Sequence, residues 1–258
     1  MDFASFNLSG SGDVIALAVH NGHDLRPDLA RRIGPDESTR LREEDPHTGL
    51  VASLFEPNVV VHRSRFELDL NRPREKAIYL DPADSWGLDV WPERLDEEQV
   101  SRSLELYDDF YDRLGSFLDT MVSEEGGFVL YDIHSYNHRR EGPGGPPAPP
   151  EENPTVNLGT GTLPERWKTV ADAFVETMRQ ARFNHAPLDV RENTRFRGGH
   201  LAAWVHQHYG EVGCALAIEL KKVFMDEWSG ELYPDRLAEL GNALVASAGP
   251  VRQAWTVA

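Results

Sequence analysis

The sequence contains a single cysteine, Cys214, among its 258 residues. One cysteine excludes an intramolecular disulfide and any metal site built from several thiolates, and it is typical of a protein kept in a reducing cytoplasm. A bound metal ion would then be held by histidine and carboxylate side chains. We therefore expect a cytoplasmic protein.

Basic residues are also scarce, since 26 Lys and Arg stand against 43 Asp and Glu, which gives a formal net charge of −17 at pH 7. A surface of this charge repels nucleic-acid phosphates and anionic lipid headgroups, so we expect no nucleic acid and no membrane as a partner. Long apolar runs are missing too. The longest one near the N-terminus, residues 14–19, is far too short to cross a bilayer, and no basic stretch precedes it.

Short apolar segments alternate with amphipathic ones. Four segments have the composition of strands: residues 14–19, 59–70, 128–133 and 215–218. Apolar side chains recur every three or four positions over residues 100–121 and 167–178, which is the period of a helix. The alternation predicts an α/β fold: a single domain over residues 1–258, with a mostly parallel mixed sheet and helices on both faces.

Residues 141–156 are crowded with Pro and Gly, which excludes a regular helix or strand. This loop follows the third predicted strand, at the edge of the sheet where the rim of an active site is expected. A loop of this length is typical either of a flap that covers a substrate or of a disordered insertion.

Three of the predicted strands lead into a polar residue, namely His20, His134 and Glu219. Ligands bind at the carboxyl edge of open α/β sheets, so these three side chains could meet there. Each one taken alone is more often an ordinary strand-end residue. Two histidines and a glutamate together favour a site.

A catalytic zinc ion takes three protein ligands and leaves one position for water. His20 and His134 supply two of these ligands. The third could be His23, which would complete a His-x-x-His unit, or a carboxylate of the charged run at residues 42–47. Spacing alone slightly favours His23.

Arginines are concentrated in residues 63–72, in an otherwise acidic chain. Arg65 and Arg72 could bind a substrate carboxylate with the neighbouring Asn71 amide, or they could simply pair with nearby acids. Glu219 could act as a general base, or it could be a buried partner of the lysines that follow it. The segments 157–161 and 193–200 read as turns that contain polar donors and glycines.

Taken in order, these motifs resemble the N-formylglutamate amidohydrolase family, in a divergent branch. The resemblance runs from about residue 14 to residue 228 and rests on the following motifs: His20-x-Gly22, Asp45, Ser64-Arg65, Asp69-Leu-Asn71-Arg72, Asp132-x-His134-Ser135, Asn157-Leu-Gly-Thr160, Asn193 with Phe196-x-Gly198-Gly199, and Glu219. The context of Asp45 and the segment 221–228 are the marks of divergence.

The resemblance implies a zinc-exopeptidase-like architecture, similar to zinc carboxypeptidases and aspartoacylases, and one Zn²⁺ ion as cofactor. By the same resemblance the site residues are as follows: His20, Asp45 and His134 as metal ligands, Asn71 and Arg72 as the carboxylate clamp, Asn193 as a further substrate-binding residue, Arg65 as a substrate-binding or oxyanion-stabilising residue, and Glu219 as the catalytic base. Asp45 thereby replaces His23 as the expected third ligand.

The implied activity is metal-dependent hydrolysis of the amide bond in an N-formyl or N-acyl acidic amino acid. The same clamp would also suit a metallocarboxypeptidase that removes an acidic or modified C-terminal residue, or a non-catalytic module that binds carboxylates. The partner in each case is a small molecule or peptide with a carboxylate. The sequence gives no basis for a subunit count.

Overall fold

The computed structural model describes residues 2–7 and 12–258. The strands are β1 (Ala4–Asn7), β2 (Val14–Ala18), β3 (Asn58–Val61), β4 (Phe128–Tyr136), β5 (Val156–Gly159), β6 (Arg182–Phe183), β7 (Ala186–Pro187), β8 (Val190–Glu192) and β9 (Gly213–Lys221). The α-helices are α1 (Pro27–Ala30), α2 (Glu37–Glu43), α3 (Thr48–Ala52), α4 (Glu97–Glu125), α5 (Lys168–Gln180), α6 (His200–Tyr209) and α7 (Pro234–Thr256). Three short 3₁₀ helices lie at Arg74–Lys76, Pro82–Asp84 and Glu165–Trp167.

Seven of the strands form one mixed sheet in the order β1-β3-β2-β4-β9-β5-β8. The central strands β3, β2, β4 and β9 run parallel, whereas β1 pairs antiparallel with β3 and β5 pairs antiparallel with β9. The carboxyl ends of β2, β4 and β9 therefore lie at the same edge of the sheet. This is the edge at which the sequence predicts a site.

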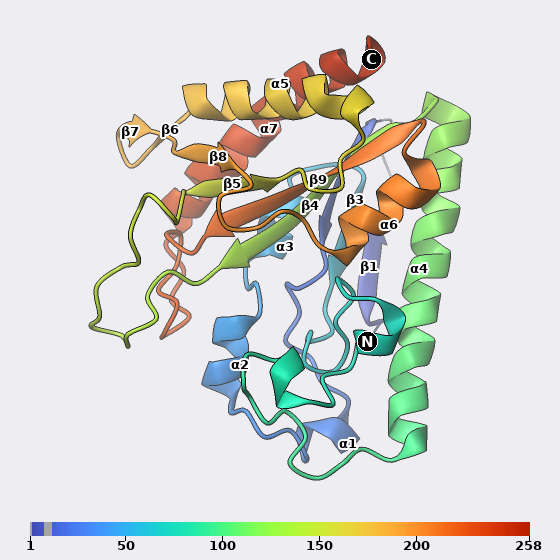
Figure 1. The fold of residues 1–258 in the computed structure, drawn as a ribbon, viewed down its shortest axis with the longest axis vertical. Helices are drawn as coiled ribbons and strands as arrows, with labels where there is room; N and C mark the ends of the chain where they lie inside the picture. Colours follow the sequence, from blue (N-terminus) through green and yellow to red (C-terminus); the bar gives the residue numbers. More distant parts are fainter. Residues whose placement is uncertain (1, 8–11) are drawn as a thin grey trace.

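Helices cover both faces of this sheet (Figure 1). On one face, α5 and α7 pack against inward-facing residues such as Ala16 and Ile218. On the other face, α4 and α6 pack against alternate residues such as Ile15 and Leu17. Because successive side chains of a strand point to opposite faces, a fully apolar β2 is buried by both layers. The predicted single-domain α/β fold with helices on both faces is confirmed.

Two of the predicted elements are wrong in extent or type. The strand expected over residues 59–70 ends at Val61, because the backbone N–H groups of Glu67 and Leu68 both donate to the carbonyl of Ser64 and turn the chain. Within the segment 157–161, read as a turn, residues 157–159 form most of β5, which pairs with both β8 and β9. A strand of four residues between turns gives too little pattern to predict.

The loop at residues 141–156 projects from the body of the molecule between β4 and β5 (Figure 1). It is irregular up to the start of β5 at Val156, as the Pro and Gly content predicts. None of the described residues 141–156 lines the cavity described below, so this conformation is not that of a flap over the site. In the described part of the chain, none of the helices has the length and apolar character to cross a bilayer.

Candidate active site

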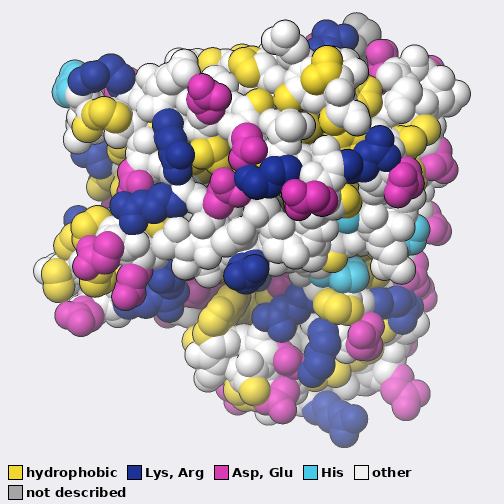
Figure 2. Space-filling view, turned by 45° about the horizontal axis from the view of Figure 1, so that its top comes forward, with side chains coloured by type: hydrophobic (Ala, Val, Ile, Leu, Met, Phe, Trp, Pro, Cys, Tyr) yellow, Lys and Arg dark blue, Asp and Glu magenta, His cyan; other side chains and the backbone are white. Residues whose placement is uncertain are grey.

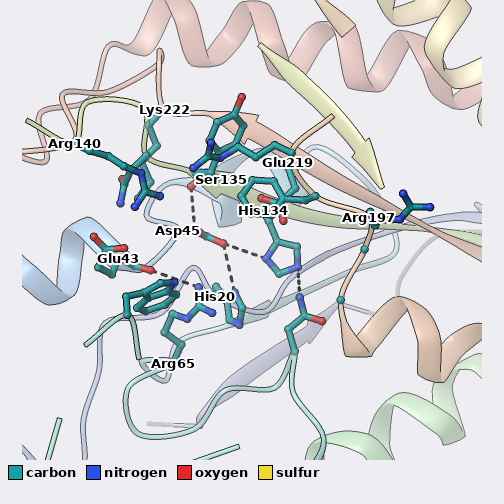
Figure 3. Close-up of a pocket in the computed structure, with 18 residues that line it drawn as sticks. His20, Glu43, Asp45, Arg65, His134, Ser135, Arg140, Arg197, Glu219 and Lys222 are labelled. Atoms are coloured by element: carbon teal, nitrogen blue, oxygen red, sulfur yellow. Dashed lines mark hydrogen bonds and ion pairs between the residues drawn. The ribbon is translucent and has the colours of Figure 1, made fainter. Parts of the chain in front are cut away.

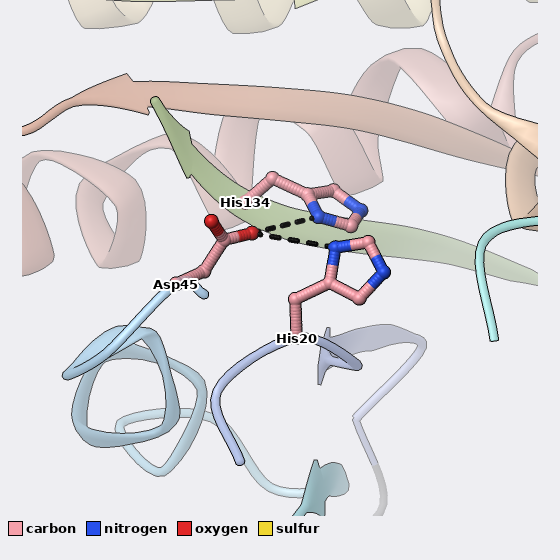
Figure 4. Close-up of side chains that lie close together, drawn as sticks. All are labelled: His20, Asp45 and His134. Atoms are coloured by element: carbon pink, nitrogen blue, oxygen red, sulfur yellow. Dashed lines mark hydrogen bonds and ion pairs between the residues drawn. The ribbon is translucent and has the colours of Figure 1, made fainter. Parts of the chain in front are cut away.

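His20, Asp45 and His134 lie together at the carboxyl edge of the sheet, and all three are buried (Figure 4). His20 comes two residues after β2, His134 lies near the end of β4, and Asp45 lies in the turn between α2 and α3. The Asp45 Oδ2 atom is 3.1 Å from His134 Nδ1 and 3.5 Å from His20 Nδ1. One ligand atom from each residue lies within 4.8 Å of the others.

This donor set fits a zinc ion. Tetrahedral bonds of ~2.0–2.1 Å separate ligand atoms by about 3.3–3.4 Å, which is close to the two Asp45–His distances. The His20 Nδ1 atom is buried and has no hydrogen-bond partner among the described residues. A buried polar nitrogen without a partner is costly unless a ligand satisfies it. Two imidazoles and one carboxylate are also ordinary zinc donors.

A second carboxylate holds each histidine from behind. His20 Nε2 lies 2.7 Å from Asp69 Oδ1, and His134 Nε2 lies 2.8 Å from Asp132 Oδ1. The Asp69 carboxylate accepts the Nε2 proton of His20 and so leaves the His20 Nδ1 lone pair free for a metal. Asp132 forms an ion pair with His134, but its carboxylate oxygens form no hydrogen bond with any residue that the structure describes. Both Nδ1 atoms face Asp45.

Asp45 is fixed in place by its own backbone and by its neighbours. Its N–H donates to the carbonyl of His20 at 2.9 Å, and its carbonyl accepts from the Thr48 hydroxyl at 2.6 Å. The Lys222 ammonium group donates to the preceding carbonyl, that of Glu44, at 2.7 Å. These bonds connect the turn to β2 and to the end of β9.

The local electrostatics favour a charged Asp45 carboxylate. Burial alone would raise the pKa of Asp45, but the imidazoles of His134 and His20, at 3.1 and 3.5 Å from its Oδ2 atom, hold it well below its usual range. Burial opposes charge on His134 too, yet the Asp132 carboxylate raises the pKa of His134 well above its ordinary value. A cation is therefore favoured at this point, whether it is a proton or a metal ion.

Glu219 lies next to His134 in the register between β9 and β4. Its partly buried carboxylate forms no hydrogen bond or ion pair with any residue that the structure describes. Burial raises the pKa of Glu219 to about 8, and the Asp45 and Asp132 charges add to this while His134 opposes it. Glu219 thus presents an unengaged carboxylate to the cavity.

The cluster opens into a cavity of about 380 Å³ (Figure 3). The lining residues are His20, Glu43, Asp45, Arg65, Asn71, Trp86, His134, Ser135, Tyr136, Asn137, Arg140, Arg195, Phe196, Arg197, Gly198, Gly199, Glu219 and Lys222. Cavities of this size accommodate a small organic ligand. Four arginines and a lysine in this lining contrast with the acidic composition of the whole chain.

Arg65 and Asn71 reach this cavity but also have protein partners. The Arg65 guanidinium donates to Asp69 at 2.9 Å and to the Tyr79 hydroxyl at 3.1 Å. The Asn71 Oδ1 atom accepts from the Leu201 N–H at 2.9 Å, and its Nδ2 atom is 3.2 Å from His134 Nε2.

A Cβ on Gly199 would lie 2.4 Å from the Asn71 amide. The glycine therefore makes room for this side chain.

Two predicted binding residues and one alternative ligand do not line the cavity. The Arg72 side chain lies 3.5 Å from Asp69 and stacks on Tyr79 at 5.0 Å. Asn193, which has a positive φ of 51°, uses its amide to hold the Thr160 N–H and hydroxyl. The His23 Nδ1 atom donates to the Glu44 carboxylate at 2.5 Å, and His23 is not part of the metal-binding group.

Sequence reasoning did not single out Trp86 or Arg140, and it read Arg195 and Arg197 only as part of the turn at residues 193–200. It considered Lys222 as a partner of Glu219 and as a sign of divergence. Trp86 and Arg140 lie in irregular segments, which no periodic pattern marks. Lys222 donates to the backbone carbonyls of Arg42 and Glu44, and such a contact between distant parts of the chain cannot be recognised from the local sequence. The sequence feature that did indicate a cationic site was the concentration of arginines at residues 63–72 in an acidic chain.

The fold and the site define a single-domain α/β protein with a possible metal site of two histidines and an aspartate at the carboxyl edge of its sheet. The chain belongs to the N-formylglutamate amidohydrolase family, whose model matches residues 12–225. It is accordingly a hydrolase of the amidohydrolase type. No functionally curated protein matches it in sequence.

Two crystal structures show the same fold. One is N-formylglutamate amidohydrolase from Ralstonia eutropha JMP134, with a TM-score of 0.76 and 16% identity over 98% of this chain and 99% of that chain. The other is a gene product of Agrobacterium tumefaciens, with a TM-score of 0.67 and 18% identity over 97% of this chain and 95% of that chain. At these identities the similarity concerns the fold.

Proposed function

We propose that this protein is a metal-dependent amidohydrolase that removes the acyl group from an N-formyl or N-acyl acidic amino acid. The main support is the convergence of His20, Asp45 and His134 on one point next to the unengaged Glu219 carboxylate. Membership of the N-formylglutamate amidohydrolase family supports the reaction type. We propose zinc as the ion because the donor set is two histidines and one carboxylate.

The ion, held by His20, Asp45 and His134, would supply an activated water and a Lewis acid for the scissile carbonyl. Glu219 would accept the proton of the attacking water and return it to the leaving amine. Its raised pKa is suited to both transfers, since an efficient general base has a pKa near the working pH. Asp69 and Asp132 would keep the imidazole rings of His20 and His134 in a fixed orientation during the reaction.

The substrate carboxylate would be held by the cationic lining of the cavity. Arg65 and Asn71 reach the cavity directly, and Arg72 stands behind them on Tyr79. A fixed clamp positions the reacting carbonyl, and positioning contributes much of the rate enhancement in such enzymes. The Asn193 amide holds Thr160 in place, and Asn193 would therefore affect substrate binding only indirectly.

Two substitutions test the assigned roles separately. His134→Ala should abolish both metal binding and hydrolysis, because a ligand is lost. Glu219→Gln should keep the metal and lower kcat by about 10²–10⁴-fold, because only proton transfer is lost. Metal content by elemental analysis and turnover of N-formyl-L-glutamate are the measurements. His208→Ala, on the exposed side of α6, is the matched control.

The outcomes distinguish the three functions considered from the sequence. Stoichiometric metal in His134→Ala would remove this residue from the ligand set, and a near wild-type rate in Glu219→Gln would reject the base. Hydrolysis of short peptides with a C-terminal glutamate, but of no N-acyl amino acid, would indicate a carboxypeptidase. A metal-free protein that binds glutamate derivatives without hydrolysis would be a binding module.

A further inference from the structure

A second cavity of about 340 Å³ adjoins the active-site cavity. The two share three lining residues, Glu43, Trp86 and Arg140. Figure 3 shows Glu43 and Arg140 on one side of the His20–Asp45–His134 cluster, with Arg197 on the opposite side. The remaining walls of the second cavity come from Ser38, Thr39, Arg42, Leu88 and Trp228.

The direction of the substrate follows from Asn71. This clamp residue packs against Gly199, in the same loop as Arg197. If the amino-acid carboxylate is held at Asn71 rather than at Arg65, which lies over Trp86, the acyl group points toward Glu43 and Arg140. The second cavity lies beyond that acyl position.

The junction between the cavities is formed by planar groups. The Trp86 side chain is 52% exposed, and its φ of 56° is an unusual conformation for a large residue. The Arg65 guanidinium lies over its ring at 5.0 Å, and Tyr79 meets its edge at 6.1 Å. The Arg140 guanidinium has no hydrogen bond, ion pair or ring contact within the described part of the chain.

The far wall is formed by Trp228. Its Nε1 atom donates to the carbonyl of Arg139 at 3.1 Å, and the Arg42 guanidinium lies over its ring at 4.2 Å. Glu43 and Glu227 neutralise Arg42. The Arg42 charge is thus balanced within the protein. What this wall offers a ligand is the planar surface of the Trp228 indole and the Arg42 guanidinium.

We infer that the substrate carries a planar aromatic acyl group, which occupies this second cavity between Trp86 and Trp228. A formyl group has one carbon and would leave the whole cavity unfilled, whereas an aromatic ring would stack on the indoles and guanidiniums. The reaction is hydrolysis: water adds to the carbonyl carbon, the amide C–N bond breaks, and an aromatic carboxylate and a free amino acid leave. This inference rests on the proposed amidohydrolase function.

The test compares kcat/KM of the metal-loaded enzyme for N-formyl-, N-acetyl- and N-benzoyl-L-glutamate and for N-formyl-L-phenylalanine. N-Benzoyl-L-glutamate should be preferred to the formyl compound by about tenfold. Trp228→Leu should lower the ratio of the benzoyl to the acetyl value at least about fivefold. Trp255→Leu is the matched control, since the Trp255 Nε1 atom also donates to a backbone carbonyl, that of Val212 at 3.2 Å.

Each outcome has a distinct meaning. Preference for N-formyl-L-glutamate would overturn the inference and leave the proposed function intact. Preference for N-formyl-L-phenylalanine would overturn the inference and also the acidic amino acid of the proposed function, while the amidohydrolase reaction would stand. An unchanged ratio in a folded Trp228→Leu variant would also overturn the inference. Failure to hydrolyse any of the four compounds would overturn the proposed function itself, and the inference with it. Thermal unfolding of both variants shows whether they are folded.

Discussion

At the scale of single residues, the site is built in two shells of carboxylates and histidines. Asp69 and Asp132 touch no ligand position themselves, yet each fixes the ring of one histidine through its Nε2 atom. Both are completely buried. A buried carboxylate destabilises the fold unless it is paired. The pairing of these two carboxylates with His20 and His134 therefore indicates that they serve to orient the two imidazole rings.

Asp132→Asn tests this arrangement. The neutral amide removes the ion pair with His134, so we expect zinc affinity to fall about 10–100-fold. Competition with a chromophoric chelator measures the affinity. The control is Asp189→Asn, whose carboxylate pairs with Arg191 near the surface. Equal affinities in Asp132→Asn and the wild type would show that Asp132 has no part in ligand orientation.

The sequence predicted the residues that follow recognisable strands. His20, His134 and Glu219 could be found because a buried parallel strand is an apolar run and its carboxyl end is a known location for ligands. Asp45 came only from a family resemblance, since a charged run in front of Pro46 has no strand to mark it. Arg140 and Trp86 could not be predicted, because long-range packing alone sets their positions.

At the scale of elements, β9 connects the Glu219 carboxylate to the rest of the candidate site. Glu219 lies within the strand, and Lys222 directly after it donates to the carbonyls of Arg42 and Glu44. The Lys222 side chain is only 1% exposed. The end of one strand thus positions both the proposed base and the turn that contains Asp45.

Helix α6 is attached to the other end of β9 by a neutral histidine. His206 Nε2 accepts from the Ala215 N–H at 3.0 Å, and its Nδ1 atom is 3.0 Å from the Thr162 hydroxyl. Burial lowers the pKa of His206 to about 4, while these hydrogen bonds oppose the shift. The folded state therefore disfavours the protonated imidazole.

His206→Gln should reduce the acid sensitivity of the fold. In the wild type the unfolded chain takes up this proton first, so stability is complete above the unfolded pKa of about 6.5 and falls as the pH drops toward 4, by about 3 kcal/mol. Glutamine keeps an acceptor for Ala215 but does not titrate. Urea unfolding near pH 7 and near pH 4 measures the difference, with His208→Gln as control. Parallel pH curves for wild type and variant would contradict the assignment.

At the scale of the whole molecule, charge is distributed unevenly between the surface and the site. The chain has a net charge of −17. On the face drawn in Figure 2, Lys and Arg side chains alternate with Asp and Glu and form no large area of one sign. The active-site cavity, in contrast, is lined by Arg65, Arg140, Arg195, Arg197 and Lys222. Recognition of a substrate carboxylate, as proposed above, would therefore be a local property of the cavity.

Metal binding should stabilise the entire fold, because its three proposed ligands come from the turn after β2, from β4 and from the turn after α2, which are far apart in the sequence. An ion that binds only the folded state adds about 2.7 kcal/mol at a free concentration of 100 Kd. For a domain of this size, that corresponds to a rise in Tm of about 5–10 °C. Calorimetry of chelator-treated protein with and without added zinc measures the shift. His134→Ala should show none. An equal shift in wild type and His134→Ala would mean that zinc acts elsewhere on this acidic surface, and the three side chains would then be a hydrogen-bonded cluster rather than a metal centre.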